Sequence, residues 1–136
     1  MHVSAHYRGD SKFEIQARGH RVMCDQPIDN GGQDTGMTPP EFLLASLASC
    51  GAYYAAQYLK TRKLPAEQLE VGVSAEKAAQ PARLSSFRIE VCAPGLDQRH
   101  REGILRAVKA CLIHNTLLGA PGIEVVVCPT AFPLAS

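Results

Sequence analysis

The longest apolar stretch of the chain covers residues 38–62, and its pattern predicts a long helix. Thr38 can cap the helix N-terminus, Pro39 stands at the first helical position, and Glu41 has the spacing of a capping box. No charged residue occurs in residues 42–59. A helix that is apolar or small on every side is normally buried. The rest of the chain is therefore expected to cover this helix. A single small domain has too few elements to cover so long a helix on every side.

Alternating apolar and polar positions predict strands on both sides of this helix. Residues 2–8, residues 12–18 and a segment beginning at residue 22 precede it, separated by short turns as in a meander. Two further strands follow, over about residues 67–77 and around residues 87–91.

A second helix is expected to begin after Asp97, which can cap it, and to stop before Gly119. Its apolar stripe includes Cys111. Residues 123–128 read as a last strand. The order β-β-β-α-β-β-α-β predicts one α+β domain over residues 1–136, with a mostly antiparallel sheet wrapped around two helices.

Composition and charge narrow the class of protein. The chain has 14 basic and 13 acidic residues, a net charge of +1, so no electrostatic footprint for nucleic acid or an anionic membrane is expected. The first ten residues contain no apolar segment typical of a secretory signal. The run of residues 42–59 is close to the length of a membrane span, but it is rich in Ala, Ser and Gly and is interpreted as part of a soluble protein.

Five cysteines occur at wide, irregular spacings. An odd number without a signal peptide favours reduced thiols in a cytoplasmic protein over a disulfide framework. Cys24, Cys92 and Cys128 lie in strand-like segments and are expected to be small buried hydrophobic residues.

Three weaker motifs are assigned structural roles. The sequence GGQDTG precedes a helix but lacks the Lys-Ser/Thr of a phosphate-binding loop, so a flexible connection is expected. The tripeptide Arg8-Gly9-Asp10 is a turn. Cys111 and His114 could share a metal ion, but no CxxC or HExxH motif accompanies them, and His114 is interpreted as a residue near a helix end.

Cys50 and Cys111 lie in the two predicted helices, which are the natural packing partners of each other. If the helices pack, the two thiols could come within disulfide range, although two inert buried cysteines remain an alternative. The stretch GGQDTGMTPPEFLLASLASC, followed by KACLIHNTL, resembles the OsmC family, which includes the organic hydroperoxide resistance proteins. The resemblance extends over nearly the whole chain.

This resemblance implies a thiol-dependent peroxidase that works as an intertwined homodimer with two sites at its interface. It implies Cys50 as the peroxidatic cysteine, Cys111 as the resolving cysteine and Glu41 as the catalytic glutamate. The spacing departs from the hydroperoxide-resistance branch, because Glu41 precedes Cys50 by nine residues rather than ten. Arg8 is the nearest positional match to the family's arginine, with Arg18 as the rival.

The implied substrate is an organic hydroperoxide of the alkyl or lipid class, because apolar side chains surround Cys50 in the sequence. They are Phe42, Leu43, Leu47, Tyr53 and Tyr54. No bound cofactor is implied, but an external dithiol must reduce the oxidised enzyme, and the family suggests a lipoylated protein or a small thiol. The alternative function is a dimeric, non-catalytic binder of a small apolar ligand with structural cysteines.

The spacing of Glu41 and Cys50 bears on the oligomer. Nine residues of helix separate the two positions by roughly 13–14 Å along the axis and place them on opposite faces. A catalytic Glu41 therefore needs a partner subunit or a bend in the helix to act on a cysteine. This geometry favours a twofold dimer in which the two central helices are buried together.

Overall fold

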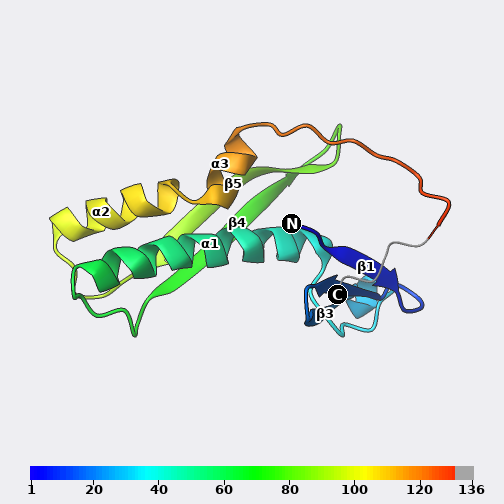
Figure 1. Cartoon of the computed structure of the whole chain (residues 1–136), viewed down its shortest axis with the longest axis horizontal. Helices are drawn as coiled ribbons and strands as arrows, with labels where there is room; N and C mark the ends of the chain where they lie inside the picture. The colour runs from blue at the N-terminus through cyan, green and yellow to red at the C-terminus, as the bar shows by residue number, and fades with distance from the viewer. Residues whose placement is uncertain (131–136) are drawn as a thin grey trace. The chain divides into compact units, whose positions relative to one another are not determined.

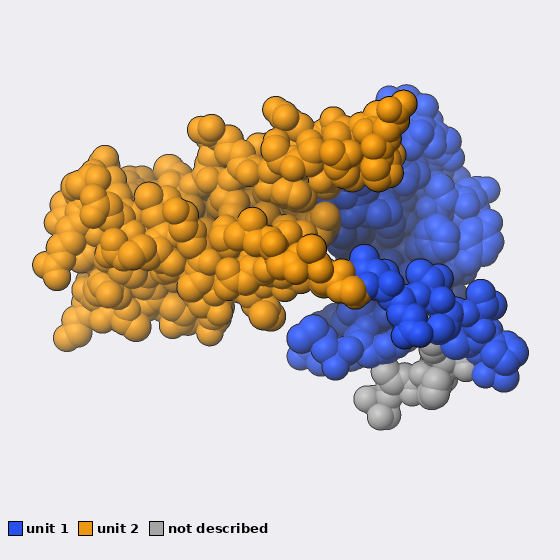
Figure 2. All heavy atoms as spheres, turned by 90° about the horizontal axis from the view of Figure 1, so that it is seen from above, with its two compact units in different colours: residues 1–42, 123–136 blue, residues 43–122 orange. Residues whose placement is uncertain are grey.

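The computed structural model describes residues 1–130 (Figure 1). The chain forms two compact units. The first unit comprises residues 1–42 together with the chain from Ile123 onward, and the second comprises Leu43–Gly122 (Figure 2). Both units are built from antiparallel strands. The expected α+β class with mostly antiparallel pairing is confirmed.

The first unit contains a three-stranded meander. Strands β1 (Ser4–Tyr7), β2 (Phe13–Ala17) and β3 (His20–Cys24) pair in sequence order. Ile15 in the central strand lies opposite Ala5 on one side and Val22 on the other. The three predicted strands are confirmed, and the third begins two residues earlier than expected.

The connection from β3 to the long helix is organised by a buried carboxylate. Asp25 is fully buried, and its Oδ1 accepts hydrogen bonds from the Ser11 hydroxyl (2.6 Å) and the Gln26 N–H (2.8 Å). Its Oδ2 accepts from the N–H of Gln33 (3.2 Å) and from the N–H (3.1 Å) and hydroxyl (2.7 Å) of Thr35. The expected flexible connection is therefore a hydrogen-bonded loop, which also holds the short helix η1 (Ile28–Asn30).

Two of the glycines in this loop are required by close backbone approaches. A Cβ atom at Gly32 would collide with the carbonyl of Gln26, and one at Gly36 would collide with the carbonyl of Met23. The glycine-rich pattern is explained by these approaches and by the hydrogen bonds to Asp25.

Helix α1 (Pro39–Thr61) begins in the first unit and continues into the second. Its N-terminus has the predicted capping box, because Glu41 Oε2 accepts from the Thr38 N–H (2.7 Å) and hydroxyl (2.9 Å). The helix does not bury all of its surface within one chain. It buries a stripe at every fourth residue, namely Leu47, Gly51, Ala55 and Leu59.

Strands β4 (Glu70–Ala78) and β5 (Arg83–Cys92) form an antiparallel hairpin in the second unit. Apolar side chains on one face pair across the strands, as the alternating pattern predicted. The pairs are Val71 with Val91, Val73 with Ile89, and Ala75 with Phe87.

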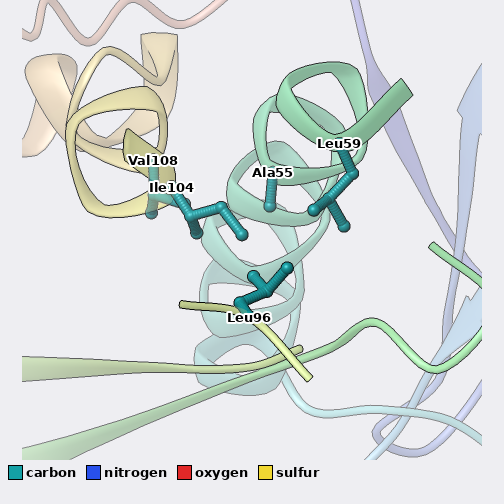
Figure 3. Close-up of a cluster of buried hydrophobic side chains, with 5 residues drawn as sticks. All are labelled: Ala55, Leu59, Leu96, Ile104 and Val108. Carbon is teal, nitrogen blue, oxygen red and sulfur yellow. The ribbon is translucent and has the colours of Figure 1, made fainter. Parts of the chain in front are cut away.

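Two more helices follow the hairpin: α2 (Gln98–Lys109) and α3 (Leu112–Leu118). Asp97 caps α2 as predicted, since its side chain accepts from the His100 N–H (2.9 Å). A buried cluster joins α1 to α2, with Ile89 and Val91 of β5 packed against it. Figure 3 shows its five members, which are Ala55, Leu59, Leu96, Ile104 and Val108.

Three expectations about these elements are wrong within this chain. The predicted second helix is two helices, because Cys111 has an extended backbone (φ −58°, ψ 134°) at the N-cap of α3. Residues 123–128 form no strand, and Ile123, Val125 and Val127 are 87–96% exposed. A strand needs a partner strand, and this segment pairs with none of the described strands. Cys92 and Cys128 are exposed, while Cys24 is buried as expected.

No helix in the described part of the chain combines the length and the apolar character needed to cross a membrane.

Candidate active site

Cys50 lies on the face of α1 that carries Leu43 and Leu47, since the three positions are spaced as i, i+4 and i+7. Its side chain is half-buried, whereas Cys111 is fully buried. Both are free thiols. Cys50 is thus the more exposed residue of the two.

The structure brings these two thiols into contact. The Cys111 thiol donates a hydrogen bond to the Cys50 sulfur, and the backbone N–H groups of Ile113 and Leu112 donate to it as well. Burial alone would raise the pKa of Cys50, but these three donors outweigh burial and lower its pKa below the ordinary value. Cys50 is therefore the more acidic thiol of the pair.

The pKa of Cys111 shifts in the opposite direction. Burial raises it, and the hydrogen bond that its proton makes to Cys50 raises it further. The backbone N–H groups of His114 and Ile113 lower the pKa of Cys111 by less. The pair thus divides its protons unequally, with the thiolate favoured on Cys50 and the proton retained on Cys111.

The break between α2 and α3 creates this arrangement. Because Cys111 caps α3 with an extended backbone, the first turn of that helix has N–H groups without helical partners. These are the groups of Leu112, Ile113 and His114, which donate to the two sulfur atoms. A continuous helix through Cys111 would have used the same N–H groups in its own hydrogen bonds.

The second unit has an apolar pocket of about 660 Å³, and neither thiol is among its lining residues. It shares with the pair the Leu43–Leu47 face of α1 and the first turn of α3 through His114. Side chains of β5 and α2 complete its wall, and the polar groups among its lining are Ser85, Lys109 and His114. Its size and apolar lining are typical of a small-molecule site.

Glu41 has the structural role that its capping box predicts. Its carboxylate is engaged by Thr38, and those hydrogen bonds, from the backbone N–H first and then the hydroxyl, lower its pKa. A catalytic role for Glu41 stays a prediction.

Arg8 and Arg18 both lie in turns of the first unit. The guanidinium of Arg8 donates to Glu14 Oε1 at 2.8 Å, and Arg8 is about half exposed. Arg18 occupies the turn between β2 and β3 with a left-handed backbone (φ 54°). That Arg8 or Arg18 is the catalytic arginine stays a prediction.

Within residues 1–130 no group of three His, Cys, Asp or Glu side chains is placed to hold a metal ion. His114 is half-buried on α3, and its Nδ1 lies 3.4 Å from Asn115 Oδ1.

Sequence reasoning missed two features of this site. One is the helix break at Cys111, because the sequence KACLIH contains no proline or glycine that would predict it. The other is the apolar pocket, whose lining includes Lys109 from the last turn of α2. The available signal for Lys109 was its place two residues before Cys111 in a basic helix end.

Comparison with known proteins agrees with this architecture. The family model described as "OsmC-like protein" matches residues 31–126. No curated protein matches the sequence of this chain.

Three solved structures share the fold at low sequence identity. A Psychrobacter arcticus protein, described as an osmotic stress induced and detoxification response protein, has a TM-score of 0.76 and 21% identity over 84% of this chain and 85% of its own. An OsmC-like protein from Mycoplasma pneumoniae has a TM-score of 0.73 and 22% identity over 88% and 87%. An organic hydroperoxide resistance protein OsmC from Legionella pneumophila has a TM-score of 0.67 and 18% identity over 86% and 88%. With the family model matching most of its length, the chain belongs to the OsmC-like protein family.

Proposed function

We propose that this protein is a thiol-dependent peroxidase that reduces organic hydroperoxides of the alkyl or lipid class. The observation that carries the proposal is the contact between Cys50 and Cys111, in which Cys50 has the lowered pKa and Cys111 the raised one. A peroxidase of this type needs one thiolate to attack and one protonated thiol held in reserve beside it.

The reaction follows from the two sulfur atoms. The Cys50 thiolate attacks one peroxide oxygen, the O–O bond breaks, and the alkoxide leaves and takes a proton from solvent to become the alcohol. Cys50 is then a sulfenic acid. The Cys111 thiol condenses with it to form a disulfide and water. An external dithiol reduces this disulfide by exchange, with a lipoylated protein or a small thiol as the expected donor.

Ionisation of Cys50 accounts for only part of the rate that such an enzyme needs. An ordinary thiol is a few per cent ionised at pH 7, so complete ionisation increases the thiolate by at most about thirtyfold. Donors that orient the peroxide and stabilise the leaving alkoxide must supply the rest. We expect an arginine in this role, Arg8 with Arg18 as the rival, and Glu41 as a carboxylate that holds it in place.

The protein is expected to act as a homodimer with two sites, without a bound cofactor. Free thiols and an external dithiol fit the reducing cytoplasm.

A peroxide-consumption assay with dithiothreitol and cumene hydroperoxide tests this function. The wild type is expected to turn over, and Cys50→Ser to lose activity completely. Cys111→Ser is expected to complete one oxidation, leaving Cys50 as a sulfenic or sulfinic acid. One equivalent of the peroxide should link Cys50 to Cys111 within one chain, as read by peptide mapping. Two free thiols after this treatment would refute the proposal.

The apolar pocket supports a second candidate, a non-catalytic binder of a small apolar ligand with structural cysteines. The same assay separates the two, because a binder neither consumes peroxide nor forms the disulfide.

A further inference from the structure

The buried carboxylate of Asp25 is an expensive group that the chemistry of the thiol pair does not use. The hydroxyls of Ser11 and Thr35 lower its pKa more than burial raises it, so Asp25 is ionised at neutral pH. Asp25 takes part in no ion pair among residues 1–130, and hydrogen bonds alone stabilise its charge. A neutral side chain could anchor a loop at a lower desolvation penalty. The loop by itself therefore does not account for a charge at this position.

Asp25 holds the chain that leads into α1. Its Oδ2 accepts from the N–H groups of Gln33 (3.2 Å) and Thr35 (3.1 Å), and its own N–H donates to the Met37 carbonyl (3.3 Å). The residue after Met37 begins the capping box that engages the Glu41 carboxylate. One residue thus fixes the approach to the helix turn that carries Glu41.

The same carboxylate reaches the turn between β1 and β2. This turn is closed by two backbone hydrogen bonds, from the Arg8 N–H to the Lys12 carbonyl (2.9 Å) and from the Lys12 N–H to the Gly9 carbonyl (2.9 Å). Ser11 lies inside the closed turn, and its hydroxyl donates to Asp25 Oδ1 at 2.6 Å. The position of the Arg8 backbone is therefore tied to that of Asp25.

We propose that Asp25 is a positioning residue, which fixes the turn that carries Arg8 against the loop that leads to Glu41. Both segments belong to the first unit. Joined to the proposed peroxidase function, on which this consequence rests, Asp25 sets the place from which Arg8 orients the peroxide. Asp25 acts through Arg8 and touches neither the peroxide nor a sulfur atom.

A second contact joins the same two segments. Lys12 Nζ donates to Gln33 Oε1 at an exposed position, where water competes for both groups. The hydrogen bond from Ser11 has a fully buried and charged acceptor, which makes it the stronger of the two contacts. Ser11 is therefore the residue at which the tie can be cut.

The tie distinguishes between the two candidate arginines. Arg18 lies in the turn between β2 and β3, whereas Asp25 follows the other end of β3. The five residues of β3 span roughly 17 Å. An effect of Asp25 on the orientation of the peroxide is thus expected through Arg8 and not through Arg18.

Amide hydrogen exchange of the reduced, full-length protein, read by NMR, tests the tie without any peroxide. Ser11→Ala is expected to reduce the protection of the Arg8 and Lys12 amides by roughly tenfold relative to the amides of β2, which report global unfolding. Ser11→Thr should keep the wild-type protection, because it keeps the hydroxyl. The matched variant Thr35→Val removes a hydroxyl donor from the same carboxylate but leaves Ser11 bound, so the turn should stay protected. Unchanged protection in Ser11→Ala, or an equal loss in Thr35→Val, would overturn the proposal.

Asp25→Asn is the second variant, because it replaces one carboxylate oxygen by an amide donor. The turn amides of Arg8 and Lys12 should lose protection together with the loop amides of Gln33 and Thr35. A loss confined to the loop would show that Asp25 holds the loop only, which contradicts its role as a tie.

Steady-state kinetics with cumene hydroperoxide and dithiothreitol test the catalytic consequence. Ser11→Ala is expected to lower kcat/KM by roughly tenfold, since a misplaced donor loses much of its effect, and Ser11→Thr should restore it. Ser86→Ala, at an exposed position of β5, should leave kcat/KM unchanged. Ser11→Ala should have no further effect in an Arg8→Ala protein and its full effect in an Arg18→Ala protein. A full effect in the Arg8→Ala protein would indicate a general loss of structure and refute the role of Asp25.

These outcomes are distinct from that of the peroxidase assay. If the wild type consumes peroxide but Ser11→Ala leaves the turn protected, the function stands and this inference falls. If the wild type consumes no peroxide, the proposed function falls, and the exchange experiment alone decides whether Asp25 fixes the turn.

Discussion

At the residue scale, two thiols of the same chemical kind acquire different proton affinities from their surroundings. Cys50 receives hydrogen bonds from the Cys111 thiol and from two backbone N–H groups, and Cys111 donates its proton while being fully buried. Burial opposes the charge at both sulfur atoms, so the difference comes from the hydrogen bonds. The hydrogen bond from Cys111 therefore favours the thiolate on Cys50.

Removal of that donor is expected to raise the pKa of Cys50. In Cys111→Ala the sulfur of Cys50 loses a hydrogen bond to its charged form, so alkylation by iodoacetamide at pH 7 should slow by roughly tenfold. The midpoint of its pH–rate profile should move upward. The rate is read on the Cys50 peptide by mass spectrometry, because Cys92 and Cys128 are exposed and also react.

Cys111→Ser serves as the matched variant, because its hydroxyl keeps a donor beside Cys50. Its profile should remain close to that of the wild type. Identical profiles for the alanine and serine variants would mean that the Cys111 proton does not set the acidity of Cys50.

At the element scale, the contact between α1 and α2 depends on a glycine. Gly103 of α2 is buried under the ring of Tyr58 from α1. The Tyr58 hydroxyl lies 3.1 Å from His100 Nδ1. The guanidinium of Arg62 stacks over the Tyr58 ring, 3.8 Å from the ring centre. The ring is thus held from several sides and has little freedom to yield.

Gly103→Ala is therefore expected to destabilise the protein although alanine is the better helix former. The new Cβ would collide with the Tyr58 ring, and displacing the ring should cost more than the gain in helix propensity of about 1 kcal/mol. We expect a net loss of roughly 1–2 kcal/mol in the free energy of unfolding, measured by urea denaturation.

Gly72→Ala in β4 is the control, because a Cβ there has no neighbour within 4 Å. Its effect should be within about 0.5 kcal/mol of zero. A Gly103→Ala protein as stable as this control would show that Tyr58 is not held in place.

At the scale of the whole molecule, one chain leaves much apolar surface uncovered. Tyr53 on α1 is 61% exposed, Leu118 on α3 is 75% exposed, and Val127 is 96% exposed. Large apolar side chains that stay exposed on one chain are candidates for contact with another protein surface. The homodimer expected from the apolar pattern of α1 stays a prediction.

We predict a dimer at micromolar concentration, as measured by light scattering or analytical ultracentrifugation. Tyr53→Arg should weaken it, because a charge would be buried without a partner. Ser86→Arg is the control. It adds the same charge at an exposed position of β5, opposite Glu76. A wild type that stays monomeric at all concentrations would contradict the prediction.

Much of the architecture follows from local sequence alone. The bounds of α1, its capping box at Glu41, the Asp97 cap and the β4–β5 hairpin were predictable, because caps and alternating positions act over a few residues. The presence of Cys50 on a helix and of Cys111 on a core-facing position follows from the same periodicities.

Tertiary structure determines the contact between Cys50 and Cys111 and the hydrogen bonds that their sulfur atoms accept. The break at Cys111 has no helix-breaking residue in the sequence, yet it exposes the N–H groups of Leu112, Ile113 and His114 to the sulfur atoms. The Asp25 carboxylate likewise gathers donors as distant as Ser11 and Thr35. Residues 123–128 have the composition of a strand but pair with none of the described strands. In each case the outcome depends on groups far apart in sequence, whose meeting is set by packing and not by local preference.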